Sequence, residues 1–196
     1  MYCGGYHFRG RSARHRMSDA MKKSRTAAQR DAIALAGLRI AVGFLFLIFG
    51  QYKVFGTQFT LHGGFQSWIK KFLQDGAAYS FMVPVLTRFV LAHATPIAFL
   101  VGYGELAIGI ALVLGVWVRA ASTCGLIYML TLLFSSNFPG NGAPVWEYFG
   151  ASLDHSVLAL CFATFVAAGS NDVLSVKHFG KRSQELQKSA TRNSPE

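Results

Sequence analysis

The chain is poor in acidic residues and in cysteine. It has nine Asp and Glu against 19 Lys and Arg, a formal net charge of +10, and no acidic residue from Leu106 to Pro144. Its three cysteines, Cys3, Cys124 and Cys161, form neither a C-x-x-C pair nor a zinc-binding spacing. The sequence therefore predicts no metal site and no redox-cysteine motif. We interpret Cys124 and Cys161 as small core residues that do not form a disulfide.

Long apolar segments are the main feature that the chain does have. Hydrophobic residues make up 52% of it and charged residues 14%, an unusual balance for a soluble domain. Crossing a hydrocarbon core of about 30 Å takes roughly 20 helical residues, and four segments approach that length. They are residues 33–55, 96–117, 120–138 and 152–169, the last of them short unless its helix begins near Pro144.

These segments predict an all-α integral membrane protein, a four-helix transmembrane bundle over residues 32–170. Fourteen Lys and Arg lie before the first segment, in the turn after the second or beyond the fourth, whereas four lie at the end of the first segment or in the first loop. Because positively charged loops stay cytoplasmic, both termini are expected on the cytoplasmic side of a multi-pass cell membrane protein, in a bacterial inner membrane. We expect residues 1–31 to form a disordered basic arm and residues 171–196 a polar cytoplasmic tail.

The clustered arginines of the basic arm can neutralise the phosphates of a nucleic acid. Beside a membrane span, however, such charges more commonly set the orientation of the protein and attract anionic lipid. We therefore expect the lipid bilayer, and no nucleic acid, as a partner of this region.

The first loop, residues 56–94, is too long to be a simple connector. Apolar side chains from Phe65 to Leu73 follow helical spacing, with two lysines on the opposite face. This pattern predicts an amphipathic helix that lies in the membrane interface. A second apolar stretch, broken at Pro84, is expected to dip into the outer leaflet, to pack on the bundle or to lengthen the second span.

The stretch GYGELAIG, residues 102–109, fits the G-x-G-x-x-[GA] pattern of a dinucleotide-binding loop. That loop requires a preceding strand and an acidic residue about 20 positions later, and the sequence has neither. Helical spacing instead places small residues and one acid on a single face, where a neighbouring helix can approach closely. These residues are Ala98, Gly102, Glu105 and Gly109. Glu105 is therefore expected to point into the bundle.

Two other predicted spans carry comparable stripes. The stripe of the first span consists of Arg39, Gly43, Phe46, Gly50 and Lys53, and that of the third consists of Cys124, Tyr128, Thr131 and Ser135. We therefore expect polar and small residues at the centre of the bundle.

Depth in the membrane limits which residues can pair with Glu105, which lies near the middle of its span. Arg39 lies about six residues, or roughly 9 Å, inside the cytoplasmic end of the first span, so its long side chain can reach Glu105. Lys53, near the outer end of the same span, is about two turns too far from Glu105. We predict an Arg39–Glu105 pair, with Tyr128 completing a candidate internal ion pair or ligand site. The pair either fixes the helix register or serves binding or proton handling. Both interpretations stay open, as does the protonation state of Glu105.

A second group of titratable residues gathers toward the predicted outer surface. Its members, which form a candidate outer proton or ligand site, are Lys53, His93, Asp154 and His155. Histidines and carboxylates at a membrane boundary can serve proton-coupled chemistry, although each of these residues has the alternative interpretation of an interfacial anchor. Asp154 and His155 are the strongest candidates, because they are buried if the fourth helix begins near Pro144.

Two motifs carry a family resemblance. GLRIAVGFLFLIFGQYKVFG occupies the first span, and GELAIGIALVLGVWVRAAS runs from the second span into a turn with arginine. On these motifs the chain resembles the DoxX/DoxD family of small membrane proteins over about residues 35–176, and its long first loop is similar to the DoxD branch, the small membrane subunit of thiosulfate:quinone oxidoreductase. The positions that match the family pattern are Arg39, Gly50, Lys53, Gly104, Glu105, Gly109, Gly115 and Arg119.

The resemblance implies a quinone-linked oxidoreductase subunit in sulfur or oxidative-stress redox chemistry. The sequence shows no haem ligand pair, flavin loop or nucleotide loop, so a quinone and a second redox subunit are the expected cofactor and partner. A homo-oligomer is also compatible with the sequence. The alternatives are a non-catalytic membrane scaffold or partner of soluble redox proteins, and a small-molecule or proton permease, against which the lack of inverted repeats argues. The sequence identifies no catalytic residue.

Overall fold

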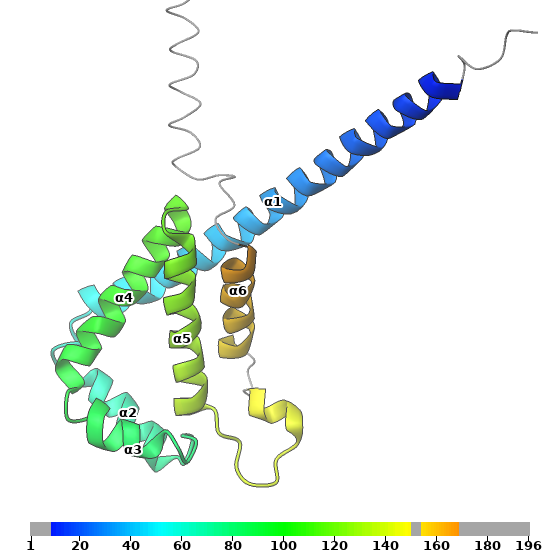
Figure 1. Cartoon of the computed structure of the whole chain (residues 1–196). Coiled ribbons are helices and arrows are strands. Elements are labelled where there is room, and N and C mark those ends of the chain that lie inside the picture. The colour runs from blue at the N-terminus through cyan, green and yellow to red at the C-terminus, as the bar shows by residue number, and fades with distance from the viewer. Residues whose placement is uncertain (1–8, 150–153, 169–196) are drawn as a thin grey trace, which may run out of the picture.

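The structure is a computed structural model that describes residues 9–149 and 154–168, and every regular element in these ranges is a helix (Figure 1). The elements are α1 Arg9–Phe55, α2 Gly64–Gln74, α3 Val83–Val85, the π-helical turn η1 Leu86–Val90, α4 Ala94–Leu114, α5 Val118–Ser136, the 3-10 helix η2 Val145–Phe149 and α6 Asp154–Ala168. The prediction of an all-α protein is confirmed for the described residues.

Three helices are long and apolar enough to cross a membrane, namely α4, α5 and the part of α1 from Met21 to Phe55. They coincide with the first three predicted spans, so the prediction of transmembrane helices is confirmed. α6 is also apolar but has 15 residues, and η2 before it is a separate short helix. Among the described residues the fourth helix therefore does not begin near Pro144, and the predicted count of four full-length spans is not confirmed.

α1 is longer than predicted. It begins at Arg9 and runs to Phe55 without a break, so the basic arm, which we expected to be disordered, is helical from Arg9 onward. Alanine, arginine and lysine are frequent in this part of the chain and are good helix formers. The first half of α1 extends beyond the other described helices (Figure 1). Residues 1–8 and the predicted tail, 171–196, lie outside the described residues.

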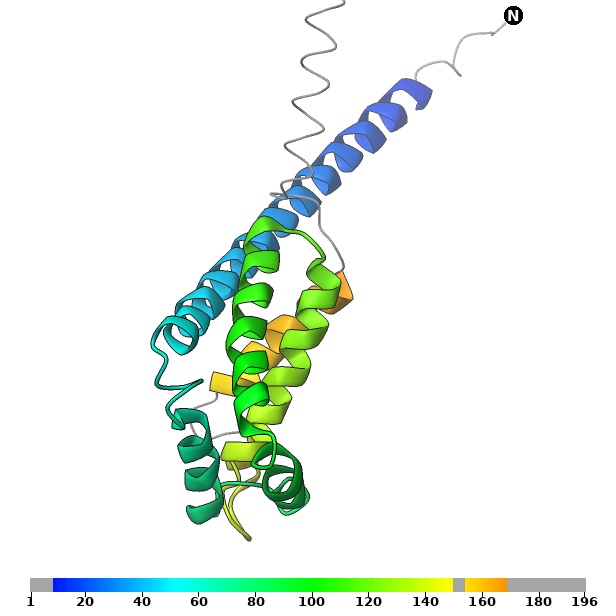
Figure 2. The same ribbon diagram turned by 90° about the vertical axis from the view of Figure 1, so that its left-hand side faces the viewer.

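α1 and α4 pack side by side along a seam of glycines (Figures 1 and 2). A Cβ atom on Gly109 would lie 2.9 Å from the carbonyl oxygen of Gly43, and one on Gly50 would lie 2.9 Å from the backbone nitrogen of Leu106. Because these neighbours are backbone atoms, a larger residue would force the helices apart. The small-residue faces predicted for the first two spans are confirmed as the contact between these helices.

α5 packs mainly on α6, and the main core joins both of them to α1 and α4. Gly125 of α5 makes room for the ring of Phe162 from α6. That ring lies nearly perpendicular to the ring of Phe46 from α1, with the two centroids 5.1 Å apart. Leu112 of α4 is fully buried in the same core. Side chains from all four apolar helices therefore interlock.

One end of the bundle, which we call the loop end, holds the C-termini of α1 and α5 and the N-termini of α4 and α6. α2 packs there, because its Phe65 and Ile69 lie in a second core with Ala94 and Ala98 of α4. The predicted amphipathic helix is confirmed as a helix; Phe65 and Ile69 of its apolar face rest on the protein, whereas Trp68 is 55% exposed. Pro84 lies in the first turn of α3, where its missing N–H is tolerated. Contrary to the prediction, the helix is not broken at this proline.

Candidate functional site

Three polar side chains from three helices meet toward the loop end. Lys53, near the end of α1, forms an ion pair with Oε1 of Glu105 on α4. Tyr128 of α5 donates a hydrogen bond of 2.6 Å to the same oxygen and accepts one of 3.2 Å from Lys53 Nζ. We call these residues the Lys53–Glu105–Tyr128 cluster.

Burial and aromatic rings shield most of this cluster from water. Glu105 is 5% exposed, and the side chain of Lys53 is 24% exposed. The Lys53 ammonium lies 5.4 Å from the ring centroid of Phe59 and 5.7 Å from that of Tyr128, within the range of cation–π attraction. One carboxylate, one hydroxyl and two aromatic rings therefore hold the cation in surroundings that screen charge weakly.

The second carboxylate oxygen of Glu105, Oε2, is buried and makes no hydrogen bond within the described part of the chain. Buried polar atoms ordinarily have a partner, either protein or ordered water. Oε2 is therefore an acceptor that a ligand or a water molecule can use. It stands in the same cluster as the Lys53 ammonium, which carries three donor N–H groups.

The predicted pairing of Glu105 with Arg39 is wrong, although Arg39 is buried in α1 at 3% exposure. Gly50 of α1 lies against Glu105, and Arg39 precedes Gly50 by eleven residues, which is about 16 Å along the helix axis. The prediction assumed that the two spans end level with one another. Gly102, two turns into α4, instead lies against Lys53, so α4 begins beyond the end of α1 and brings Glu105 within reach of this lysine.

The predicted polar stripe of α5 turns inward only in part. Tyr128 is half-buried and Ser135 is buried, but Thr131 is exposed. The rotation of α5 about its axis is set by Gly125, which has to face the Phe162 ring of α6. Packing on α6 therefore decides which face of α5 is buried, and the polar spacing of the sequence does not.

Both described cysteines are free thiols. Cys161 is half-buried against the main core, as predicted. Cys124 is exposed, so its interpretation as a small core residue is wrong. It lies directly before Gly125 and thus points away from the face of α5 that meets α6.

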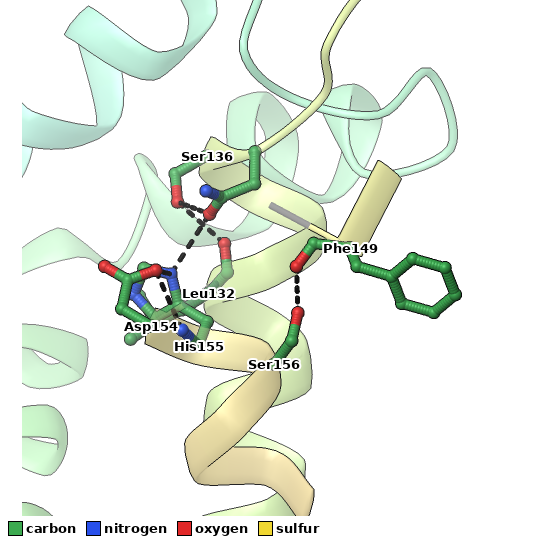
Figure 3. A network of polar contacts seen from close by, with 7 residues as sticks. Leu132, Ser136, Phe149, Asp154, His155 and Ser156 are labelled. Carbon is green, nitrogen blue, oxygen red and sulfur yellow. Dashed lines mark hydrogen bonds and ion pairs between the residues drawn. The ribbon is translucent and has the colours of Figure 1, made fainter. Parts of the chain in front are cut away.

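The four residues of the predicted outer site do not come together. Lys53 belongs to the cluster with Glu105. His93 is exposed, and its Nδ1 lies 3.0 Å from the carbonyl oxygen of Phe89, whose ring it also contacts. Asp154 and His155 lie at the start of α6 (Figure 3). Within the described ranges no three His, Cys, Asp or Glu lie close enough together to hold a metal ion.

His155 has a partner that sequence reasoning missed. Its Nδ1 lies 3.1 Å from Oδ1 of Asn137, at the end of α5, and 3.2 Å from Oδ1 of Asp154. Two oxygen acceptors beside Nδ1 favour a proton on that nitrogen and leave Nε2 as the basic one. Asp154 is exposed; its burial was expected only if the helix began near Pro144, and α6 is described from Asp154. The signal for Asn137 was its position at the end of a span, where Asn often terminates helices.

Comparison with known proteins gives one match. The family model described as DoxX matches residues 34–137, more than half of the chain. The matched segment contains α4, α5 and every residue of the Lys53–Glu105–Tyr128 cluster. No curated protein and no solved structure matches the chain.

Proposed function

Because the chain belongs to the DoxX family of membrane proteins, we propose that it is a membrane subunit of a quinone-linked oxidoreductase in sulfur or oxidative-stress redox chemistry. The similarity of its motifs and long first loop to the DoxD branch supports this choice. The Lys53–Glu105–Tyr128 cluster is the proposed quinone site.

The unpartnered Oε2 of Glu105 is the observation that carries this proposal. A quinol has hydroxyl groups that donate hydrogen bonds, and a quinone has carbonyl oxygens that accept them. Glu105 Oε2 suits the hydroxyl, and the ammonium of Lys53 suits the carbonyl. The cluster therefore contains partners for both forms of the molecule, as reversible quinone chemistry requires.

The reduction of a quinone to a quinol adds two electrons and two protons. The sequence has no haem, flavin or nucleotide motif, so the electrons would come from a redox centre of a partner subunit. Tyr128 would give one proton from its hydroxyl and regain it from water, and the Glu105 carboxylate would take up the other from water and pass it to the second quinone oxygen. Lys53 would stabilise negative charge as it forms on the nearer oxygen.

Retention of quinone tests this function. Purified protein in lipid nanodiscs is incubated with ubiquinone or menaquinone, washed and analysed by mass spectrometry for quinone bound per chain. Glu105→Gln and Tyr128→Phe should each lower the bound quinone by about 5- to 150-fold, because loss of one partner of a buried hydrogen bond costs about 1–3 kcal/mol. Tyr103→Phe, at an exposed tyrosine of α4, is the matched control and should bind like the parent. Equal binding by all of these proteins would exclude the cluster as the quinone site.

A non-catalytic membrane scaffold is the second candidate, and a specific observation favours it. The cluster draws one side chain from each of α1, α4 and α5, so it also ties three helices together. A scaffold predicts that Glu105→Gln lowers the free energy of unfolding while neither the parent nor the variant retains quinone. The same nanodisc measurement, combined with an unfolding curve, distinguishes the two functions.

A further inference from the structure

η2, which precedes α6 in the chain, presents large apolar side chains outward. Val145, Trp146 and Phe149 are 77%, 60% and 58% exposed. Trp146 and Phe149 are three residues apart and so share one face of the 3-10 helix. Glu147 is the one charged residue from Asn137 to Phe149, and it is half-buried.

η2 is held firmly beside the end of α5. The hydroxyl of Tyr148 donates a hydrogen bond of 3.0 Å to the carbonyl of Gly140, and the carbonyl of Tyr148 accepts one of 3.0 Å from the hydroxyl of Tyr79. Tyr79 is itself anchored, because its backbone N–H donates to the carbonyl of Phe134 on α5 at 3.0 Å. Its ring lies 5.0 Å from that of Phe138. η2 therefore has a fixed place at the loop end (Figure 1).

We propose that η2 is seated in lipid at the loop end, with its exposed apolar face at the boundary between hydrocarbon and headgroups. The neighbouring helices also present apolar side chains outward, since Ile127 on α5 and Leu160 on α6 are 60% and 68% exposed. Tryptophan favours the boundary between hydrocarbon and headgroups. The exposed face of η2 offers no charge with which a water-soluble partner could pair, and interfaces with such partners have polar rims. Lipid is therefore the occupant that this face fits.

This inference does not depend on quinone binding, and the three tryptophans of the chain make it testable. The double variant Trp68→Phe, Trp117→Phe leaves Trp146 as the single tryptophan. It is reconstituted into phosphatidylcholine vesicles whose acyl chains carry bromine either near the headgroups or near the bilayer centre, because bromine quenches tryptophan fluorescence on contact. The shallow bromine should remove more fluorescence than the deep one, and acrylamide in the water should remove little.

A control variant shows what full exposure to lipid looks like. It carries Leu160→Trp on the exposed side of α6, with all three native tryptophans replaced by Phe, and the deep bromine should quench it more strongly than the shallow one. Quenching of Trp146 by acrylamide and by neither brominated lipid would place η2 in water and overturn the proposal. Protection of Trp146 from all three quenchers would place it under another protein surface and overturn the proposal equally.

Discussion

Gly109→Ala tests the glycine seam that sets the register of α1 against α4. The added Cβ would lie 2.9 Å from the carbonyl oxygen of Gly43 and from side-chain carbons of Leu47. Ordinary van der Waals contacts begin at 3.4 Å, so the new atom is too close by 3.4 minus 2.9, or 0.5 Å. Because the oxygen belongs to the backbone of α1, the two helices have to move apart. We expect this overpacking to cost about 1–3 kcal/mol.

Gly104→Ala is the matched control on the same helix. A Cβ at Gly104 would meet no atom within 4 Å, so this substitution adds a methyl group without a clash. Both substitutions replace glycine inside a helix and gain the same intrinsic helix propensity, about 1 kcal/mol. The difference in stability between the two variants therefore isolates the contact between α1 and α4.

The assay is reversible unfolding in mixed micelles with increasing sodium dodecyl sulfate, followed by the loss of helical circular dichroism. The free energy of unfolding of Gly109→Ala should be lower than that of Gly104→Ala by about 1–3 kcal/mol. If the two variants are equally stable, the helices do not approach one another through Gly109, and the register that pairs Glu105 with Lys53 loses its support.

Two further predictions concern charge. Glu105→Gln leaves the Lys53 ammonium without its carboxylate and should lower the free energy of unfolding by about 2–3 kcal/mol, the low end for a broken buried pair because Lys53 is partly exposed. The double variant Glu105→Gln, Lys53→Met should regain part of that free energy, because no unpaired charge remains. If the losses of unfolding free energy in the two single variants simply add in the double variant, the pair is not coupled. At the loop end, burial, and after it the neighbouring Tyr148, raise the pKa of Tyr79 above its ordinary value of 10.0. The folded chain then keeps a proton that the unfolded chain loses, so this stabilisation is present below pH 10 and is lost as the pH rises through the folded-state pKa. Unfolding curves above pH 10 should therefore fall less steeply with pH in Tyr79→Phe than in the parent, whereas Tyr52→Phe, at a tyrosine 82% exposed, should keep the parent slope.

Hydropathy located the long helices well. The second predicted span, 96–117, became α4 from Ala94 to Leu114, and the third, 120–138, became α5 from Val118 to Ser136. Apolar length is a property of the segment itself, so it can be recognised without knowing what surrounds the segment. The same holds for α2, whose amphipathic spacing within the first loop was visible in the sequence.

Periodicity also identified the inward faces of α1 and α4. Gly43, Gly50, Glu105 and Gly109 are all buried, as their spacing of three and four residues predicted. The corresponding prediction failed for Thr131 of α5. In the first two spans the small residues are themselves the contact, whereas on α5 a single glycine beside an aromatic ring of α6 outweighs the polar spacing.

The sequence by itself determined that this protein is helical, that three of its helices can span a membrane, and that Glu105 faces a neighbouring helix. These properties follow from the hydropathy and periodicity of single segments. Only the tertiary structure decided that the partner of Glu105 is Lys53 and not Arg39, and that His155 meets Asn137. Both pairings depend on how far one helix is displaced along another, and that displacement is set where the backbones approach most closely.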